Sequence, residues 1–493
     1  MAASLALVGY LVWGSRSWPL IHDAPLMHYV AWLMSQGAVP YRDAFDMNLP
    51  GAYLIHSAVL ATAGPSDLAW RLFDLAWLAA TCLLLYAYCR PIGDHEAALL
   101  AALLFALYHL SGGAWRAGQR DFLLSLFLLA GAYGVSRALE EGGPALPLLL
   151  GGLALGAGMT LKPHAGLYWL GCAAAAGSSL RRAQRPALAR AGVVLGGGLV
   201  IPALVFGWLA WRGGLRPFVE ILAGYVLPLY SQVGRVGPWQ PFGGYRWGWA
   251  LWSLLLALGV LGLLSRAAQG WACRRVLALL GALYGLVHFI VQGKGWEYQL
   301  YPLAMFLVIL AAPALARATA SGEPRGLAAF ARPAGLAVAA ALVLVLGAKG
   351  ADAQEAPWIA DKARRVAAVT RDLEPLVPPG ATAQVLDVTE GGVHALLNLH
   401  LRQPTRFLYD FHFFHDVGDR RIQALRDELA GGLVRTPPAA VVVFRDTWNR
   451  PGYERLAELP RVAALLARSY ELAVDGDGYR IYVWRIDEKR SRP

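Results

Sequence analysis

The stretch His22–Gly51, HDAPLMHYVAWLMSQGAVPYRDAFDMNLPG, follows an apolar N-terminal segment and carries three carboxylates, Asp23, Asp43 and Asp46. A buried carboxylate beside a membrane is costly unless it is paired or used. These acids lie among aromatic and basic residues, and the segment after Asp23 reads as an amphipathic helix that ends at Gly37. The stretch therefore predicts a polar site at a membrane surface.

The composition predicts a polytopic α-helical membrane protein. Of the 493 residues, 57% are hydrophobic and only 16% are charged, whereas soluble domains carry about 25% charged residues. The mean hydropathy is +0.43, and long apolar runs recur until about residue 348. Residues 1–348 are therefore expected to form a transmembrane domain, with residues 21–66 as its first outer loop.

Apolar runs of roughly 17–25 residues are long enough to span a bilayer, and about eleven are expected. They lie near 3–20, 67–90, 96–112, 120–137, 146–160, 165–180, 191–211, 247–266, 274–292, 299–317 and 328–348. The first run lacks a basic start and a cleavage site, so it is expected to be a retained span. Segments near 51–63 and 215–230 are expected to be half-inserted or interfacial helices.

The net charge of +11 reflects membrane topology rather than nucleic-acid binding. Many arginines form short clusters between apolar runs, as expected of cytoplasmic loops. These clusters are Arg181, Arg182, Arg185 and Arg190; Arg266, Arg274 and Arg275; and Arg317, Arg325 and Arg332. The topology that follows has a cytoplasmic N-terminus and an extracytoplasmic C-terminus, in a multi-pass protein of the cytoplasmic (inner) membrane.

Residues 349–493 are more polar and predict a small extracytoplasmic α/β domain. Helical spacing is expected over 361–373, 391–399, 419–429 and 454–468, and strands over 383–388, 439–444, 470–474 and 479–486. The run AAVVVF at 439–444 suits a central strand, and Asp475–Gly478 suits a hairpin turn. His400, His412 and His415 are interpreted as part of an aromatic-rich loop that covers the site, rather than as metal ligands.

Polar residues near the predicted outer helix ends come from five separate stretches, which indicates one shared aqueous cavity on the outer face. They are Asp23, Arg42, Asp43, Asp46, Arg116, Gln119, Arg120, Asp121, Lys162, His164, Lys294, Glu297 and Tyr298.

Asp23, Tyr29, Gly37, Pro40-Tyr41, Asp43, Asn48 and Pro50-Gly51, at their spacing, resemble the first outer loop of polyprenyl-phosphate-dependent glycosyltransferases of the GT-C class. This group includes the protein O-mannosyltransferases and the aminoarabinose transferase of lipid A. The similarity recurs at Gly118-Gln119-Arg120-Asp121, Leu161-Lys162-Pro163 and Lys294–Gln299. The chain departs from the pattern at Ala24, where many relatives carry Glu, and at Gln299, where His is common.

The resemblance implies that a sugar on a polyprenyl phosphate is transferred, with inversion, to an outer-face glycan, lipid or protein acceptor. A hydroxyl acceptor must lose a proton to a nearby base, and the leaving phosphate must meet a cation. The candidate catalytic carboxylates are Asp23 first, and then Asp43 and Asp46. Arg120 and Lys294, with Arg116 and Lys162 in reserve, are the candidate phosphate ligands.

Further residues are expected to bind substrate: Tyr41, Arg42, Asp121, Trp296, Glu297 and Tyr298, with Trp115, Trp239 and Trp247 as additional aromatic surfaces for a sugar. No cofactor is assigned, and a divalent metal is left open. The expected partners are the lipid-linked sugar, the bilayer and the acceptor, not nucleic acid.

Two alternatives belong to other functional classes. A transporter or lipid flippase would need ionisable residues near the bilayer midplane and, often, repeated halves. The second alternative is a membrane scaffold whose C-terminal part binds a partner. The charged residues at helix ends favour the transferase.

Overall fold

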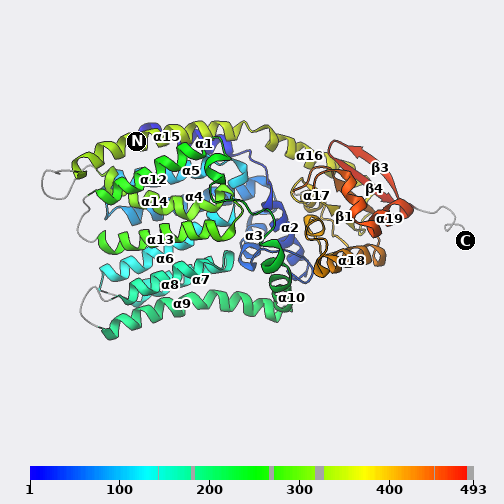
Figure 1. Ribbon diagram of the computed structural model, residues 1–493, viewed down its shortest axis with the longest axis horizontal. Helices are drawn as coiled ribbons and strands as arrows, with labels where there is room; N and C mark the ends of the chain where they lie inside the picture. Colours follow the sequence, from blue (N-terminus) through cyan, green and yellow to red (C-terminus); the bar gives the residue numbers. More distant parts are fainter. Residues whose placement is uncertain (143, 179–183, 266–270, 317–326, 449, 486–493) are drawn as a thin grey trace, which may run out of the picture.

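The structure is a computed structural model that describes residues 1–142, 144–178, 184–265, 271–316, 327–448 and 450–485. A bundle of long helices occupies one side of the molecule, and a smaller α/β unit built from the C-terminal residues caps one end of it (Figure 1). This confirms the expected combination of a helical bundle and a small sheet.

Each predicted span overlaps a helix. The bundle helices are α1 (Ala2–Ser15), α4 (Asp67–Cys89), α5 (His95–Leu110), α6 (Arg120–Glu140), α7 (Ala145–Leu161), α8 (Ala165–Gly177), α9 (Gln184–Trp211), α12 (Gly248–Leu264), α13 (Trp271–Gln292), α14 (Tyr301–Leu315) and α15 (Leu327–Gln354). Within the described residues, six helical segments are long and apolar enough to cross a membrane, and five further apolar helices are shorter. The count of about eleven spans stays a prediction.

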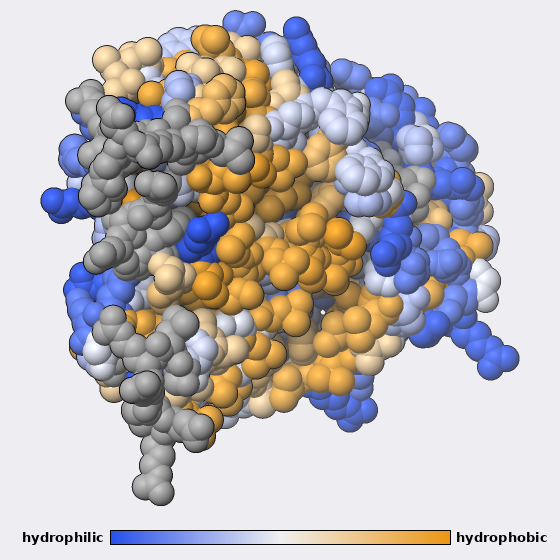
Figure 2. Space-filling model, turned by 60° about the vertical axis from the view of Figure 1, so that its left-hand side comes forward, coloured by the Kyte–Doolittle hydropathy of each residue, from blue (hydrophilic) through white to orange (hydrophobic). Residues whose placement is uncertain are grey.

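The bundle exposes apolar side chains on its outside, as a protein in lipid does. Figure 2 shows a broad apolar surface across the bundle, with hydrophilic residues gathered to the side. Inside, α14 is the central helix, because every residue from Tyr301 to Leu315 is buried. Glycines allow close helix packing: a Cβ on Gly152 of α7 would lie 2.7 Å from the carbonyl oxygen of Val194 in α9.

The described ends of α8 and α9, α12 and α13, and α14 and α15 meet at the end of the bundle away from the C-terminal unit (Figure 1). Of the predicted basic clusters, Arg190, Arg275 and Arg332 lie in the first turns of the described parts of α9, α13 and α15, whereas Arg181, Arg182, Arg266, Arg317, Arg325 and the side chain of Arg185 lie outside the described residues. Arg274 is not a free loop residue, because its guanidinium is buried and pairs with Glu140 at 2.7 Å. The orientation across the membrane stays a prediction.

Short helices lie between the bundle and the C-terminal unit (Figure 1). They are α2 (Asp23–Ser35), α3 (Pro50–Ala63), η1 (Ala114–Arg116), α10 (Leu215–Ile221), the π-helix η2 (Leu222–Tyr230), α11 (Gln240–Gly243) and η3 (Glu297–Leu300). As predicted, α2 ends just before Gly37, whose φ of 91° favours glycine.

The C-terminal unit is a four-stranded sheet with helices. Its elements are α16 (Pro357–Leu373), η4 (Glu374–Leu376), β1 (Ala383–Leu386), α17 (Gly392–Asn398), η5 (Phe411–Phe413), α18 (Arg420–Arg435), β2 (Ala440–Phe444), η6 (Tyr453–Glu458), α19 (Pro460–Ser469), β3 (Tyr470–Gly476) and β4 (Tyr479–Trp484). The helix expected over 454–468 is divided into η6 and α19, because Pro460 lacks an amide hydrogen and starts a new helix.

The strand order is β1-β2-β4-β3, with β1 parallel to β2 and the other pairs antiparallel. All five residues of β2 are buried, and β3 and β4 form the predicted hairpin. The last bundle helix differs from the prediction: α15 continues beyond residue 348 to Gln354.

The first outer loop joins the C-terminal unit to the bundle. The Phe45 amide donates to the Arg406 carbonyl at 2.6 Å, and the Tyr29 hydroxyl donates to the Leu401 carbonyl at 2.8 Å. The loop is thus held between the two parts of the molecule.

Candidate active site

Asp23 and Arg120 form an ion pair, although they are 97 positions apart in the chain. Asp23 begins α2 and Arg120 begins α6, and the Arg120 Nη2 lies 3.1 Å from the Asp23 Oδ2. The Asp23 side chain is 25% exposed and the Arg120 side chain is 12% exposed. The Arg120 Nε is buried without a hydrogen-bond partner among the described residues. The pair therefore keeps access to solvent and has an unused donor.

The turn before α6 aims Arg120 at this position. Gly118 has a φ of 68°, and a Cβ there would overlap the ring of Trp70. Its amide donates to the Asp74 Oδ1 at 2.7 Å. Asp74 is fully buried and also pairs with Arg71 and with the His109 Nε2, the latter at 3.0 Å. This buried network holds the turn in place.

Asp121 and Lys162 form a second ion pair next to the first. The Lys162 Nζ lies 3.2 Å from the Asp121 Oδ2, and the His288 Nε2 lies 2.6 Å from the Asp121 Oδ1. Burial and the Arg120 charge lower the pKa of Lys162, while Asp121 and Asp23 oppose that shift. The predicted residues Asp23, Arg120, Asp121 and Lys162 therefore share one site. His288 belongs to it and was missed.

Asp46 is fully buried and accepts three kinds of hydrogen bond: from the Tyr53 hydroxyl at 2.6 Å, from the Asn48 amide group at 2.9 Å and from the Met47 amide at 2.6 Å. Burial raises its pKa, although these donors and the Arg120 charge lower it. These donors already occupy both carboxylate oxygens. Asp46 therefore holds Met47, Asn48 and Tyr53 in place beside the site.

Two tyrosines that were not named as site residues lie near the Asp23–Arg120 pair, and one of them, Tyr409, begins the aromatic-rich loop that was expected to cover the site. Tyr230 ends η2, and Tyr409 comes from the C-terminal unit. Burial, followed by the charges of Asp23 and Asp46, raises the pKa of Tyr409 well above its ordinary value. Burial also raises the pKa of Tyr230, which the Arg120 charge lowers. The C-terminal unit thus contributes a side chain to the site.

Lys294 lies behind Tyr230. Its Nζ is 4.3 Å from the centre of the Tyr230 ring, and it donates to the Tyr230 carbonyl at 2.8 Å and to the Val233 carbonyl. Burial, followed by the charge of Arg235, lowers the pKa of Lys294 to about 8. No carboxylate pairs with it among the described residues, so its charge is held by carbonyl oxygens and a ring and is not neutralised by an acid.

Arg116 and Glu297 lie together in a buried ion cluster. The Arg116 Nη2 and the Lys349 Nζ are 2.7 and 2.9 Å from the Glu297 Oε2. Arg116, expected as a reserve phosphate ligand, is 1% exposed and committed to Glu297, so the structure gives it an internal partner instead. Tyr298 contacts both Trp115 and Trp296 at ring distances of 5.5 Å.

Among the described residues, no hydrogen bond or ion pair joins Tyr41, Arg42 or Asp43 to the Asp23–Arg120 or Asp121–Lys162 pairs, so their place at the site stays a prediction. Arg42 and Asp43 pair with each other at 2.7 Å; Arg42 is exposed and Asp43 is half-buried. Asp43 also accepts from the Val39 amide at 2.8 Å, and the Tyr41 hydroxyl donates to the Asn48 carbonyl at 2.6 Å. These short-range bonds close the turn and consume the polar atoms expected at the site.

The remaining candidates are spread over other surfaces. Trp239 is 70% exposed, and the Trp247 Nε1 donates to Asp352 at 2.8 Å. His412 and His415 both bond the hydroxyl of Tyr225, at 2.6 and 2.9 Å, whereas His400 contacts Trp32. Within the described part of the chain, no group of three or more His, Cys, Asp or Glu side chains is arranged to hold a metal.

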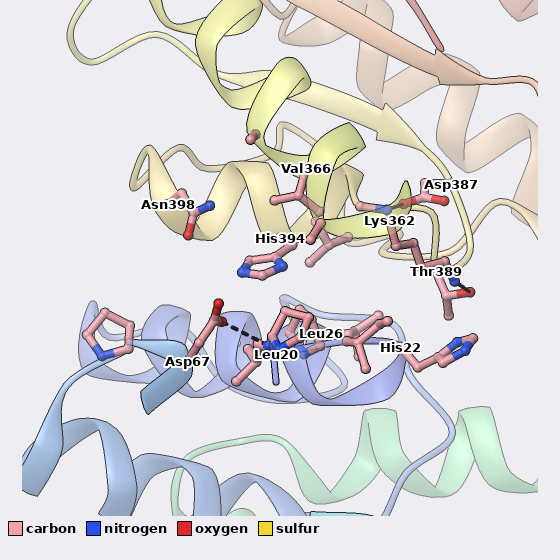
Figure 3. A pocket seen from close by; sticks show the side chains of 18 of the residues that line it. Leu20, His22, Leu26, Asp67, Lys362, Val366, Asp387, Thr389, His394 and Asn398 are labelled. Carbon is pink, nitrogen blue, oxygen red and sulfur yellow. Dashed lines mark hydrogen bonds between the residues drawn. The ribbon is translucent and has the colours of Figure 1, made fainter. Parts of the chain in front are cut away.

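A cavity of about 370 Å³ separates the first outer loop from the C-terminal unit. In Figure 3, His22, Leu26 and Asp67 line it from below, and Lys362, Thr389 and His394 face them from above. Burial and the Lys362 charge lower the pKa of His22 to about 3, so this imidazole is neutral at pH 7. The residue next to Asp23 therefore borders the space between the first loop and the C-terminal unit.

Three comparisons with known proteins bear on this geometry. Residues 48–211 match the model of the dolichyl-phosphate-mannose-protein mannosyltransferase family. A search of curated protein sequences finds no match. Several solved structures share the fold.

One is ArnT from Cupriavidus metallidurans bound to undecaprenyl phosphate, with a TM-score of 0.62, 13% identity, and coverage of 98% of this chain and 97% of ArnT. Another is the archaeal oligosaccharyltransferase AglB from Archaeoglobus fulgidus in complex with an inhibitory peptide and a dolichol phosphate. Its TM-score is 0.51 at 11% identity, over 99% of this chain and 75% of AglB.

A third is the arabinofuranosyltransferase AftD from Mycobacteria, with a TM-score of 0.51 and 16% identity, over 99% of this chain and 42% of AftD. The partial family match and the shared fold confirm the resemblance drawn from the first outer loop, and the chain is a multi-pass membrane protein with the GT-C glycosyltransferase fold.

Proposed function

We propose that this chain is a glycosyltransferase that moves a sugar from a polyprenyl-phosphate carrier to an acceptor on the outer face of the cytoplasmic membrane. The observation that carries the proposal is the partly open Asp23–Arg120 pair, with Lys162 close by. A base and a cation at one site are what sugar transfer from a lipid phosphate requires. That ArnT and AglB are solved with undecaprenyl and dolichol phosphate supports this class of donor.

In the proposed reaction, the Asp23 carboxylate accepts a proton from the acceptor hydroxyl. The acceptor oxygen then forms a bond to the anomeric carbon as the bond from that carbon to the phosphate oxygen breaks. The electron pair of the broken bond stays on the polyprenyl phosphate, and attack from the opposite side inverts the anomeric carbon. Arg120 and Lys162 stabilise the charge that develops on the leaving phosphate.

Lys294 and Tyr409 complete the proposed site. Lys294 has no carboxylate partner among the described residues and supplies a third cation for the phosphate, after Arg120 and Lys162. Tyr409 brings a hydroxyl from the C-terminal unit close to Asp23 and Asp46. The domain division near residue 349, the eleven spans and the extracytoplasmic C-terminus belong to the same proposal, because the site lies at the end of the bundle that faces this unit.

The test is transfer by the purified full chain in lipid nanodiscs, supplied with a panel of polyprenyl-phosphate sugars and with envelope acceptors. Release of free polyprenyl phosphate and labelling of the acceptor are measured together. We expect both to rise in step with time. Absence of both with every lipid-phosphate donor contradicts the proposed function.

A further inference from the structure

A second cavity, of about 360 Å³, lies beside the proposed site. His22, which directly precedes Asp23, lines it, as does Trp115, whose ring contacts Tyr298. The volume is in the range of roughly 300–1,000 Å³ that small-molecule sites occupy. This cavity is therefore close to the reacting groups without containing them.

Aromatic rings form much of its wall. The rings of Trp358 and Trp115 lie 5.3 and 5.7 Å from that of His22, and Tyr245 lies 6.5 Å from Trp115. Trp358 comes from α16 and is 40% exposed, although it lines the cavity. Such rings offer a flat apolar surface together with polar edges.

The other notable lining group is the Glu297 carboxylate, which is 3% exposed. Arg116 and Lys349 both bind its Oε2, whereas its Oε1 is buried and has no hydrogen-bond partner among the described residues. Leaving a buried acceptor unpaired costs about 1–3 kcal/mol, and more for a charged group. A hydrogen-bond donor from a ligand would relieve that cost.

We propose that this cavity is a saccharide subsite, an inference that rests on the proposed function. A sugar ring lies against Trp358 and Trp115 and donates a hydroxyl hydrogen to the Glu297 Oε1. Flat rings beside a buried acceptor suit the apolar faces and outward hydroxyls of a sugar. The Glu297 Oε1 accepts a hydroxyl hydrogen but repels a phosphate oxygen, so the free acceptor favours a neutral sugar ring over a phosphate.

Direct binding tests the subsite without requiring turnover. The probes are methyl α-mannopyranoside, methyl α-glucopyranoside and N-acetylglucosamine, added to the full chain in nanodiscs and followed by saturation-transfer NMR. We expect at least one probe to bind the wild type and to bind Trp358→Ala at least tenfold more weakly. Trp484→Ala is the matched control, because Trp484 is 38% exposed and lies on β4. No binding by the wild type, or equal binding by Trp358→Ala, overturns the subsite.

Glu297→Gln is the second variant, and we expect it to weaken the binding of the same probe. It removes the partner of two buried cations, so it is interpreted only if its melting temperature shows a folded protein. If it does not fold, Trp358→Ala alone decides.

Transfer kinetics then show whether the sugar ring in the subsite belongs to the acceptor or to the lipid-linked donor. If the subsite holds the acceptor, Trp358→Ala raises the KM of the acceptor about tenfold and leaves the KM of the donor unchanged. If it holds the donor sugar, the reverse is expected. Both KM values unchanged within twofold overturns the subsite. Probe binding without any transfer would instead retain the subsite and refute the proposed transferase.

Discussion

Two acid–arginine pairs flank the turn that precedes α6, and their carboxylates differ in how many partners they have. Asp74 is wholly buried, and Arg71, His109 and the Gly118 amide all bond it. Asp23 is 25% exposed, and Arg120 is the ion-pair partner that the structure gives it. A carboxylate whose bonds are all filled supports the fold, whereas one with capacity left can take a proton from a substrate.

The largest effect is expected from Asp23→Asn, which keeps the shape of the side chain and removes its basicity. A positioned general base contributes roughly 10²–10⁴-fold to a rate. We therefore expect transfer to fall by about that factor, with little change in melting temperature. Rates and melting curves of the two proteins are compared in the same nanodiscs. Equal transfer by both would remove Asp23 from the mechanism.

Asp74→Asn is expected to act on the fold instead. Removing one partner of a buried ion pair costs roughly 3–5 kcal/mol, and the Gly118 turn loses its charged acceptor. Thermal unfolding in detergent measures the loss. A variant as stable as the wild type would show that the buried network does not hold the turn, and the contrast between the two pairs would no longer stand.

Arg120→Lys preserves the charge but removes the planar guanidinium and its free Nε. A hydrogen bond to a charged group is worth about 1.5–3 kcal/mol, which corresponds to roughly a 10–100-fold slower transfer. The leaving phosphate is the measured product. An unchanged rate would mean that Arg120 only neutralises Asp23.

Lys294 sets an expected pH dependence. Its pKa is lowered to about 8 by burial and by Arg235, so it is a cation below pH 8 and loses its proton above it. At pH 9 about one tenth remains charged. Affinity for the polyprenyl-phosphate donor should therefore fall up to about tenfold between pH 7 and pH 9. Lys294→Arg stays charged over this range and should flatten the profile; the same profile in both proteins would exclude Lys294 as the cause.

The smallest effect is expected from Asp43→Asn, which serves as the acid control for Asp23. Asp43 pairs with Arg42 at an exposed turn, where ion pairs contribute about 0–1 kcal/mol. Transfer should stay within about twofold of the wild type and the melting temperature should barely move. A large loss of transfer would return the turn at Tyr41–Asp43 to the site.

Much of the fold follows from local patterns in the chain. Apolar length marked the bundle helices, and Gly37 marked the end of α2. The β3–β4 hairpin and the buried strand β2 were also recovered. Helix ends were less predictable: α1 ends at Ser15 and α15 continues to Gln354, because neighbouring packing rather than composition sets where a helix stops.

The candidate site was predicted in part. Placing charged helix ends on one face brought Asp23, Arg120, Asp121 and Lys162 into one group, and the structure shows these side chains together. His288 was missed, although an ionisable residue inside a membrane helix is itself a signal. Tyr409 was expected only as part of an aromatic-rich cover, because its exact place depends on how the C-terminal unit docks on the first loop.

The apolar runs and their periodicity were enough to identify a helical membrane protein with polar residues gathered at helix ends, because apolar length and periodicity are properties of neighbouring residues. Which partners each acid has depends on the tertiary structure. Asp43, Asp46 and Asp23 look alike in the stretch His22–Gly51, yet one closes a turn, one accepts bonds from buried donors and one faces Arg120. A carboxylate takes its role from burial and from the donors around it, and those come from distant segments of the chain.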